Sequence, residues 1–230
     1  MKRAVCLLSG GLDSTTAAYQ IRKDGFEIIA LTIHYGQIHS KEIESAKMIA
    51  AELKAPHEIL KMSLPWGGSA LLDKSIPIPT NRTQDEMIRS VPVTYVPARN
   101  TIFLSYAMSF AEVSKADAIV IGANVLDYSG YPDCRPEYLQ AFEEVIRLGT
   151  KAGDEGAEIK ILAPLLHMNK KEIVELAAGL GVPFEKTWSC YQGGESPCGE
   201  CDSCQLRIKG FDRAGIKDPL MKGMKWPVSI

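Results

Sequence analysis

Short apolar runs alternate with amphipathic segments along the first 180 residues of the chain. The apolar runs are typical of buried strands and stand at 4–8, 27–33, 57–62, 118–121 and 158–162. The segments between them have apolar residues at helical spacing and predict helices that begin near 15, 40, 101, 136 and 169. Strands that alternate with helices are typical of a parallel sheet covered on both faces. We therefore predict an α/β fold with a doubly wound, mostly parallel sheet.

The stretch from Ser63 to Pro92 interrupts this alternation. It contains four prolines and the pair Gly67-Gly68 and shows little periodicity, so we predict a long loop with at most one short helix near Gln84–Ser90. A connection of this length in a compact domain usually has a function or is disordered. The length favours a lid over the site, and an arm that contacts a second copy of the chain is favoured nearly as well.

Charge and composition give no reason to expect nucleic acid or a membrane as a partner of this protein. The net charge is −2 and the isoelectric point is near 6.1, so there is no electrostatic reason to expect nucleic acid. No apolar run approaches the roughly 20 residues that a membrane span needs, and Met1-Lys2-Arg3 leads directly into the first strand without a signal peptide. We expect a cytoplasmic protein that acts on small molecules, with no nucleic acid and no membrane partner.

The hexamer Ser9-Gly10-Gly11-Leu12-Asp13-Ser14 lies between the first strand and the first helix. Two glycines can take positive φ and let the backbone approach a ligand closely. Backbone N–H groups at a helix N-terminus form an anion site. Two glycines alone would suit an ordinary strand-to-helix turn, but the whole hexamer favours a phosphate site.

Four of the six cysteines cluster near the C-terminus, at Cys190, Cys198, Cys201 and Cys204. Four thiolates suit tetrahedral zinc, and with no open coordination position such a zinc is structural. An iron–sulfur cluster is the main alternative, and a redox dithiol is a weaker one. Cys6 is expected in the core, and Cys134 would need a base to act as a nucleophile.

Further polar residues follow other predicted strands, where open parallel sheets bind ligands. Arg99 can neutralise phosphate, and Asn100 can cap the helix that follows. The loop after 121 is rich in polar and aromatic residues: Asp127 and Asp133 can accept from an N–H edge, and Tyr128 or Tyr131 can stack on a flat ring. By composition alone this segment would be a turn-rich surface loop.

The hexamer resembles the pyrophosphate loop, Ser-Gly-Gly-x-Asp-Ser, of the N-type ATP pyrophosphatases, which cleave ATP between its α and β phosphates. The Gly-Lys-Ser/Thr ending of the Walker loop is absent. The resemblance implies an adenine nucleotide alpha hydrolase-like fold with ATP as substrate and Mg²⁺ near Asp13. It implies nucleotide contacts at Leu8, Ser9, Gly10, Gly11, Leu12, Asp13, Ser14, Thr15, Thr16, Ala17, Ala18, His34 and Tyr35.

Taken together, five stretches resemble the 7-cyano-7-deazaguanine synthase family of the queuosine pathway over nearly the whole chain. They are the hexamer, His34–Gln37, Tyr95–Asn100, Asp127–Arg135 and the four clustered cysteines. The resemblance implies that ATP adenylates 7-carboxy-7-deazaguanine, that ammonia displaces AMP to give the amide, and that a second ATP drives loss of water to the nitrile.

The resemblance also implies the roles of individual residues. The catalytic residues are expected to be Asp13, Ser14 and Arg99, with free ammonia as the nitrogen source. The substrate contacts are expected at Asn100, Asn124, Asp127, Ser129, Gly130, Tyr131 and Asp133. We expect a pyrophosphatase domain over 1–180, a zinc-binding segment over 181–230, one structural Zn²⁺ and a homodimer.

Two other classes of protein stay open. A tRNA-modifying ATP pyrophosphatase of the thiolation or lysidine type should carry a basic extension, which the net charge of −2 does not favour. A zinc-ribbon nucleic-acid module should surround its cysteines with basic and aromatic residues, and only Trp188 and Tyr191 stand nearby.

Overall fold

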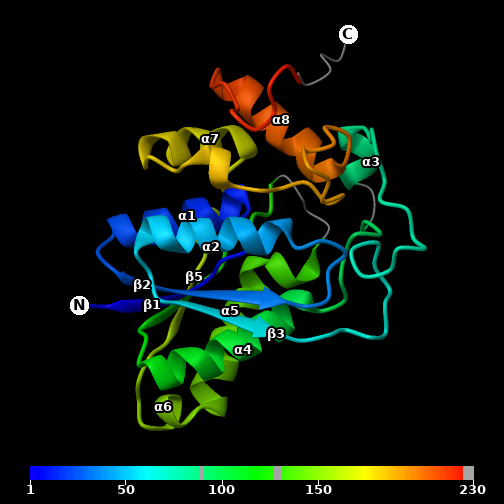
Figure 1. Cartoon of the computed structure of the whole chain (residues 1–230). Helices are drawn as coiled ribbons and strands as arrows, with labels where there is room; N and C mark the ends of the chain where they lie inside the picture. The colour runs from blue at the N-terminus through cyan, green and yellow to red at the C-terminus, as the bar shows by residue number, and fades with distance from the viewer. Residues whose placement is uncertain (89–90, 127–130, 225–230) are drawn as a thin grey trace.

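The computed structural model describes residues 1–88, 91–126 and 131–224 (Figure 1). Five strands of this part form one parallel sheet in the order β3-β2-β1-β4-β5. The strands are β1 (Arg3–Leu7), β2 (Glu27–His34), β3 (His57–Lys61), β4 (Ala118–Val120) and β5 (Lys160–Leu162). The longer helices are α1 (Leu12–Lys23), α2 (Lys41–Leu53), α4 (Arg99–Ser114), α5 (Pro136–Gly149), α7 (Lys170–Gly179) and α8 (Asp202–Ala214). The shorter ones are α3 (Gln84–Ile88), α6 (Lys151–Asp154), η1 (Pro132–Cys134) and η2 (Phe184–Lys186).

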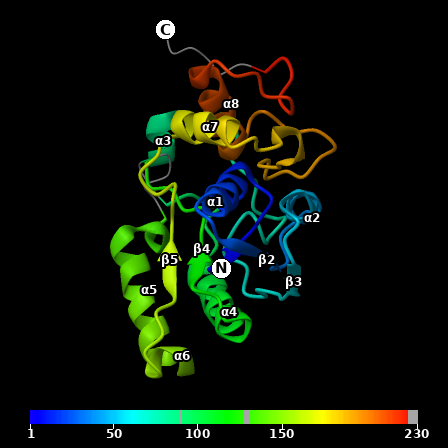
Figure 2. The same cartoon turned by 90° about the vertical axis from the view of Figure 1, so that its left-hand side faces the viewer.

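Helices cover both faces of the sheet, which confirms the predicted doubly wound fold. Alternate residues of a strand point to opposite faces, so Ala4 and Cys6 of β1 join one core while Val5 joins the other. The first core is shared with α1, α2, α7 and α8, and the second with α4 and α5 (Figures 1 and 2). Cys6 is 1% exposed, as expected for a core residue.

The strand order creates a crevice at the carboxyl ends of β1 and β4. The chain leaves β1 toward β2 on one side and later returns to pair β4 with the other side of β1. At such a switch point the two connections diverge, and a ligand can enter between them. The turn that contains the predicted phosphate site follows β1 and therefore lies at this crevice.

The long stretch between β3 and α4 contains α3 as its one helix in the described residues, as predicted. It docks on the cysteine-rich segment: the Asn81 N–H donates to the Glu200 carbonyl at 2.8 Å. Arg82 donates through Nε to Asp202 at 3.0 Å, and its Nη2 binds the second oxygen of the same buried carboxylate. None of its described residues lines the main cavity, and Leu71 lines a smaller cavity beside it. The lid and the arm both stay predictions.

One helix of the C-terminal segment was not predicted. The clustered cysteines Cys201 and Cys204 stand at the start of α8, where their spacing indicates a metal-binding turn. Gly210 lies inside the helix, and glycine is a poor helix former. Packing overrides this propensity, because α8 lies against α7 and buries Leu206, Ile208 and Phe211. No helix in the described part of the chain is long and apolar enough to cross a membrane.

Candidate active site

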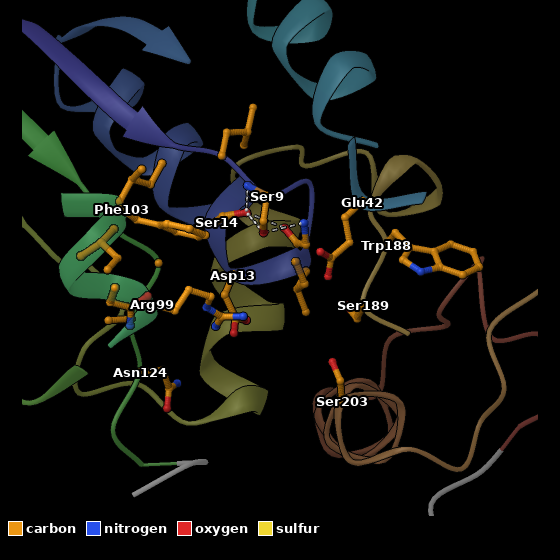
Figure 3. Close-up of a pocket in the computed structure, with 18 of the residues that line it drawn as sticks. Ser9, Asp13, Ser14, Glu42, Arg99, Phe103, Asn124, Trp188, Ser189 and Ser203 are labelled. Carbon is orange, nitrogen blue, oxygen red and sulfur yellow. Dashed lines mark hydrogen bonds between the residues drawn. The ribbon is translucent and has the colours of Figure 1, made fainter. Parts of the chain in front are cut away.

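A cavity of about 280 Å³ occupies the crevice at the carboxyl ends of the strands. The turn after β1, the end of β2 and residues 121–124 after β4 form its floor. The first residues of α2, α4 and α7 and parts of the segment 188–207 form its walls (Figure 3). The cavity therefore combines elements from the two ends of the chain.

The turn after β1 is tied together by its own serines. The Ser9 and Ser14 hydroxyls lie 2.9 Å apart, and the Ser9 N–H donates to Ser14 Oγ at 3.2 Å. Gly11 is the N-cap residue of α1, so the N–H groups of the first helical turn lie outside the helical hydrogen-bond ladder. These groups and the positive end of the helix favour an anion at this point.

Gly10 is required by packing as well as by backbone conformation. Its φ is +81°, and a Cβ atom there would lie 2.4 Å from the Ala46 backbone nitrogen and 2.6 Å from the Glu42 carbonyl oxygen. On the opposite side, a Cβ on Gly122 would lie 2.8 Å from Ser14 Cα. The turn is therefore held between the start of α2 and the end of β4.

The Asp13 carboxylate is oriented by a lysine from the far end of the domain. Lys170 Nζ donates to the two Asp13 oxygens at 2.9 and 2.8 Å. Lys170 is the first residue of α7, where the helix dipole disfavours a cation. The sequence analysis missed this residue, although a lysine pair in the first turn after the Asn169–Glu172 capping box is the signal that marks it.

Close packing of α8 places this lysine. A Cβ on Gly210 would lie 2.5 Å from Lys170 Cγ and 3.0 Å from the Lys170 carbonyl oxygen. The absence of a side chain at Gly210 thus lets α7 approach α8. The Lys170 ammonium then reaches the phosphate turn.

Arg99 and Tyr35 form a second polar group on the cavity wall, and both were predicted site residues. Arg99 Nη1 donates to the Tyr35 hydroxyl at 3.3 Å, and its guanidinium lies 5.8 Å from the Tyr35 ring centre and 5.9 Å from that of Phe103. Burial raises the pKa of Tyr35, so the hydroxyl is neutral. The guanidinium keeps its charge available for a phosphate.

Asp133, a predicted substrate contact, is not among the residues that line the cavity. Its carboxylate accepts from the Asn100 backbone N–H at 3.0 Å and so satisfies the N-terminus of α4. Asn100 is a lining residue, and its Nδ2 donates to the Asp133 carbonyl at 3.2 Å and contacts Cys134 Sγ at 3.1 Å. Burial raises the pKa of the Cys134 thiol to about 11, with Asp133 adding to the effect, so this cysteine is no ready nucleophile.

Two further predicted substrate contacts line the cavity, Tyr131 and Asn124. The Tyr131 ring stacks on Tyr95 at a centroid distance of 5.7 Å. Asn124 accepts from the Leu126 N–H at 3.0 Å and donates to the Met168 carbonyl, which fixes its amide. The predicted contacts Asp127, Ser129 and Gly130 lie outside the described residues.

The predicted nucleotide contacts divide into two groups. Seven of them line the cavity: Leu8, Ser9, Gly11, Leu12, Asp13, Ser14 and Tyr35. Six do not: Gly10, Thr15, Thr16, Ala17, Ala18 and His34. Thr15 to Ala18 are buried inside α1 against the sheet, and Gly10 packs on α2. The nucleotide contacts at these positions stay a prediction.

The segment before the first clustered cysteine contributes cavity residues that the sequence analysis missed. The Trp188 N–H donates to the Gly10 carbonyl at 2.9 Å, and Trp188 Nε1 donates to the Cys190 carbonyl at 2.9 Å. Ser189 follows and faces the cavity together with Ser203 of α8 (Figure 3). The cysteine-rich segment is thereby tied directly to the phosphate turn.

The four predicted metal ligands converge. All four Sγ atoms lie within 4.8 Å of one another, those of Cys190, Cys198, Cys201 and Cys204. The Cys201 N–H lies 3.3 Å and the Glu200 N–H 3.4 Å from Cys198 Sγ, which favours a thiolate there. Around one ion with bonds of about 2.3 Å, tetrahedral sulfurs lie about 3.8 Å apart. The cluster fits a single metal ion, and thiolates on four different irons would have to stand further apart.

Comparisons with known proteins agree on one family. A model described as "Queuosine biosynthesis protein QueC" matches residues 3–215. A 7-cyano-7-deazaguanine synthase of Trichodesmium erythraeum is 56% identical over 95% of this chain and 100% of that protein. One of Nostoc punctiforme is 53% identical over 95% and 99%. The 7-cyano-7-deazaguanine synthase 2 of Desulfitobacterium hafniense is 55% identical over 96% of this chain and 93% of that protein.

Proposed function

The chain belongs to the QueC family of queuosine biosynthesis proteins, and on this premise we propose that it is a 7-cyano-7-deazaguanine synthase. The enzyme would use two ATP to convert 7-carboxy-7-deazaguanine and ammonia into the nitrile, through an adenylated acid and then an adenylated amide. The observation that carries the proposal is the phosphate turn after β1, which shares one cavity with Arg99 and Lys170 in a chain of this family.

The phosphate side of the cavity supports adenylyl transfer. Attack of the substrate oxygen on the α-phosphorus breaks the bond to the β-phosphate, and the leaving pyrophosphate gains negative charge. The N–H groups at residues 11–14, together with Arg99 and Lys170, would stabilise that charge, which is the main task in such a transfer. Mg²⁺, when bound near Asp13, would neutralise part of the phosphate charge. Ser14 Oγ positions the turn through its bonds to Ser9.

The remaining wall supports binding of a flat heterocycle. Tyr131 and Phe103 offer aromatic surface, and Asn100 and Asn124 offer amide groups to an N–H and C=O edge. Asp133 has a positioning role in this proposal: its carboxylate holds the α4 N-terminus from which Arg99 and Asn100 project. Holding the two reactants together would supply much of the rate acceleration.

We also propose one structural Zn²⁺ on the four cysteines. The supporting observation is the convergence of four sulfurs within 4.8 Å with no further ligand position needed. The ion would stabilise the segment that carries Trp188 and Ser189. The division into a domain over 1–180 and a zinc segment over 181–230 stays a prediction, and residues from both parts line the cavity. The homodimer stays a prediction.

The proposed activity is tested by product identification. Purified chain is incubated with ATP, Mg²⁺, ammonium and 7-carboxy-7-deazaguanine, and products are identified by mass spectrometry. We expect the nitrile, with two AMP and two pyrophosphates released for each nitrile. Pyrophosphate release that requires bulk tRNA and ignores the deazapurine acid would instead support a tRNA-modifying activity.

A further inference from the structure

A carboxyl group that none of the contacts above uses stands where the main cavity meets a smaller one. Glu42, in the first turn of α2, lines the cavity of about 280 Å³ and also a side cavity of about 30 Å³. Its side chain projects from α2 into the space that Asp13 and Ser189 also face (Figure 3). In the described part of the chain, no hydrogen bond or salt bridge engages this carboxylate.

The side cavity has the size of one or two small molecules. A water molecule needs about 10–15 Å³ of such volume, and the side cavity offers about 30 Å³. Its walls are formed by Tyr35, Gln37, Ile38, His39, Glu42, Leu71, Arg99 and Tyr191. The purine and phosphate groups of the other substrates are far too large for it.

The walls of the side cavity include three groups that can accept hydrogen bonds, beside the Arg99 guanidinium and the Tyr35 and Tyr191 hydroxyls. The buried His39 Nδ1 has no hydrogen-bond partner among the described residues, and a ring nitrogen without hydrogen accepts. Gln37 Oε1 accepts from the Tyr35 N–H at 3.0 Å and keeps a second lone pair. The Glu42 carboxylate is a third acceptor beside these two. Ammonium has four N–H donors and no acceptor, so it can donate to all three groups.

The environment of Glu42 also suits proton transfer. Burial raises the pKa of Glu42 to about 7, and the Arg99 guanidinium partly opposes this. The titratable or charged groups around it are Arg99, Tyr35, Tyr191 and His39 in the side cavity, and Asp13 and Lys170 in the main cavity. The Cys190 thiol acts on it electrostatically. A base whose pKa lies near the working pH is the most effective one.

We propose that Glu42 is the catalytic base for the nitrogen substrate, which enters as ammonium and binds in the side cavity. The proposal rests on the proposed function and deepens it. One N–H bond of ammonium breaks and its proton bonds to a Glu42 oxygen, which frees the nitrogen lone pair. That lone pair attacks the adenylated carboxyl carbon, the C–O bond to AMP breaks, and AMP leaves with the electron pair. The extra proton on nitrogen and the proton on Glu42 then pass to solvent.

The test separates adenylation from nitrogen transfer in Glu42→Gln. Exchange of labelled pyrophosphate into ATP, dependent on 7-carboxy-7-deazaguanine and without ammonium, measures adenylation, and we expect it within about twofold of the unsubstituted chain. Amide formation with ammonium should fall at least about 100-fold, the usual contribution of a positioned base. Glu44→Gln is the matched control, because Glu44 lies on the same helix with its side chain 60% exposed, and it should leave both steps unchanged.

Chemical rescue and pH dependence exclude a merely structural effect. Hydroxylamine is largely unprotonated at neutral pH, so Glu42→Gln should form the hydroxamate at nearly the unsubstituted rate. The ammonium-dependent rate of the unsubstituted chain should fall below about pH 7 as Glu42 becomes protonated, and the variant should lack this limb.

Three results would overturn the assignment. Equal loss of exchange and amide formation would place Glu42 in nucleotide binding or in the fold. Unchanged amide formation would make it a bystander. Absence of exchange in the unsubstituted chain would show that the proposed function itself fails, and the assignment with it.

Discussion

Two walls of the same cavity are built in different ways. The turn at Ser9–Ser14 is shaped by backbone conformation, two serines and the tight approach of α2. The wall from Trp188 to Arg207 has little regular structure before α8 and is held by buried side chains. Its centre is Arg207, which is 1% exposed and binds both oxygens of Asp218, at 2.6 and 3.0 Å.

The two walls differ in what they contribute to stability and to chemistry. The first wall is local in sequence and rests on a strand and a helix that the core already fixes. The second wall joins residues that are distant from the sheet, and Arg207 also donates to Thr187 Oγ1 at 2.8 Å and to the Phe184 carbonyl at 3.2 Å. Changes in the first wall should therefore reduce turnover, and changes in the second should first reduce stability.

Loss of the metal should have the largest effect. Metal-binding free energy is folding free energy in such a segment, so Cys201→Ser should lower the free energy of unfolding by at least about 5 kcal/mol and Tm by about 10–20 °C. Thermal unfolding and elemental analysis measure this, and a chelator should produce the same shift in the unsubstituted chain but none in the variant. A metal-free chain of equal stability, or one with iron and acid-labile sulfide, would contradict the zinc assignment.

Breaking the buried ion pair should come next. Asp218→Ala leaves the Arg207 guanidinium buried without its carboxylate, which costs about 3–5 kcal/mol. The exposed pair Arg147–Glu144 is the matched control, and Glu144→Ala should leave the free energy of unfolding nearly unchanged. Denaturant unfolding compares them; equal small losses would show that the second wall does not depend on Arg207.

Substitution in the first wall should reduce turnover and leave stability nearly unchanged. Asp13→Asn keeps the shape of the side chain but removes the charge that faces Lys170. We expect kcat to fall about 100- to 1,000-fold with Tm changed by no more than about 2 °C. Asp154→Asn, exposed on α6, is the control for both readouts. A large Tm loss with little change in kcat would reverse the roles assigned to the two walls.

Gly210→Ala should change the free energy of unfolding the least, and the sign of that change is informative. In an exposed helix the change from glycine to alanine stabilises by about 1 kcal/mol. Here the new Cβ would meet Lys170, so we expect a loss of about 1 kcal/mol and a several-fold lower kcat as Lys170 shifts from Asp13. A stabilised variant with full activity would show that close packing of α7 and α8 does not position Lys170.

The parts that could be predicted are those that the local sequence determines. The strand and helix periods predicted the sheet, the hexamer predicted its turn, and the cysteine spacing predicted a cluster that the structure brings together. Glu42, Lys170 and Trp188 were missed because only tertiary packing carries them to the cavity. Asp133 was placed near the right loop, but the unsatisfied N–H groups of α4 decide where its carboxylate points.

Whether one cavity holds both substrates can be seen in a crystal structure with 7-carboxy-7-deazaguanine and α,β-methylene-ATP, which cannot be cleaved between the α and β phosphates. We expect the β and γ phosphates against the N–H groups of residues 11–14, within reach of Arg99 and Lys170. We expect the deazapurine in the same cavity, beside Tyr131 and Asn124. Phosphates bound away from the turn, or the two ligands in separate cavities, would contradict it.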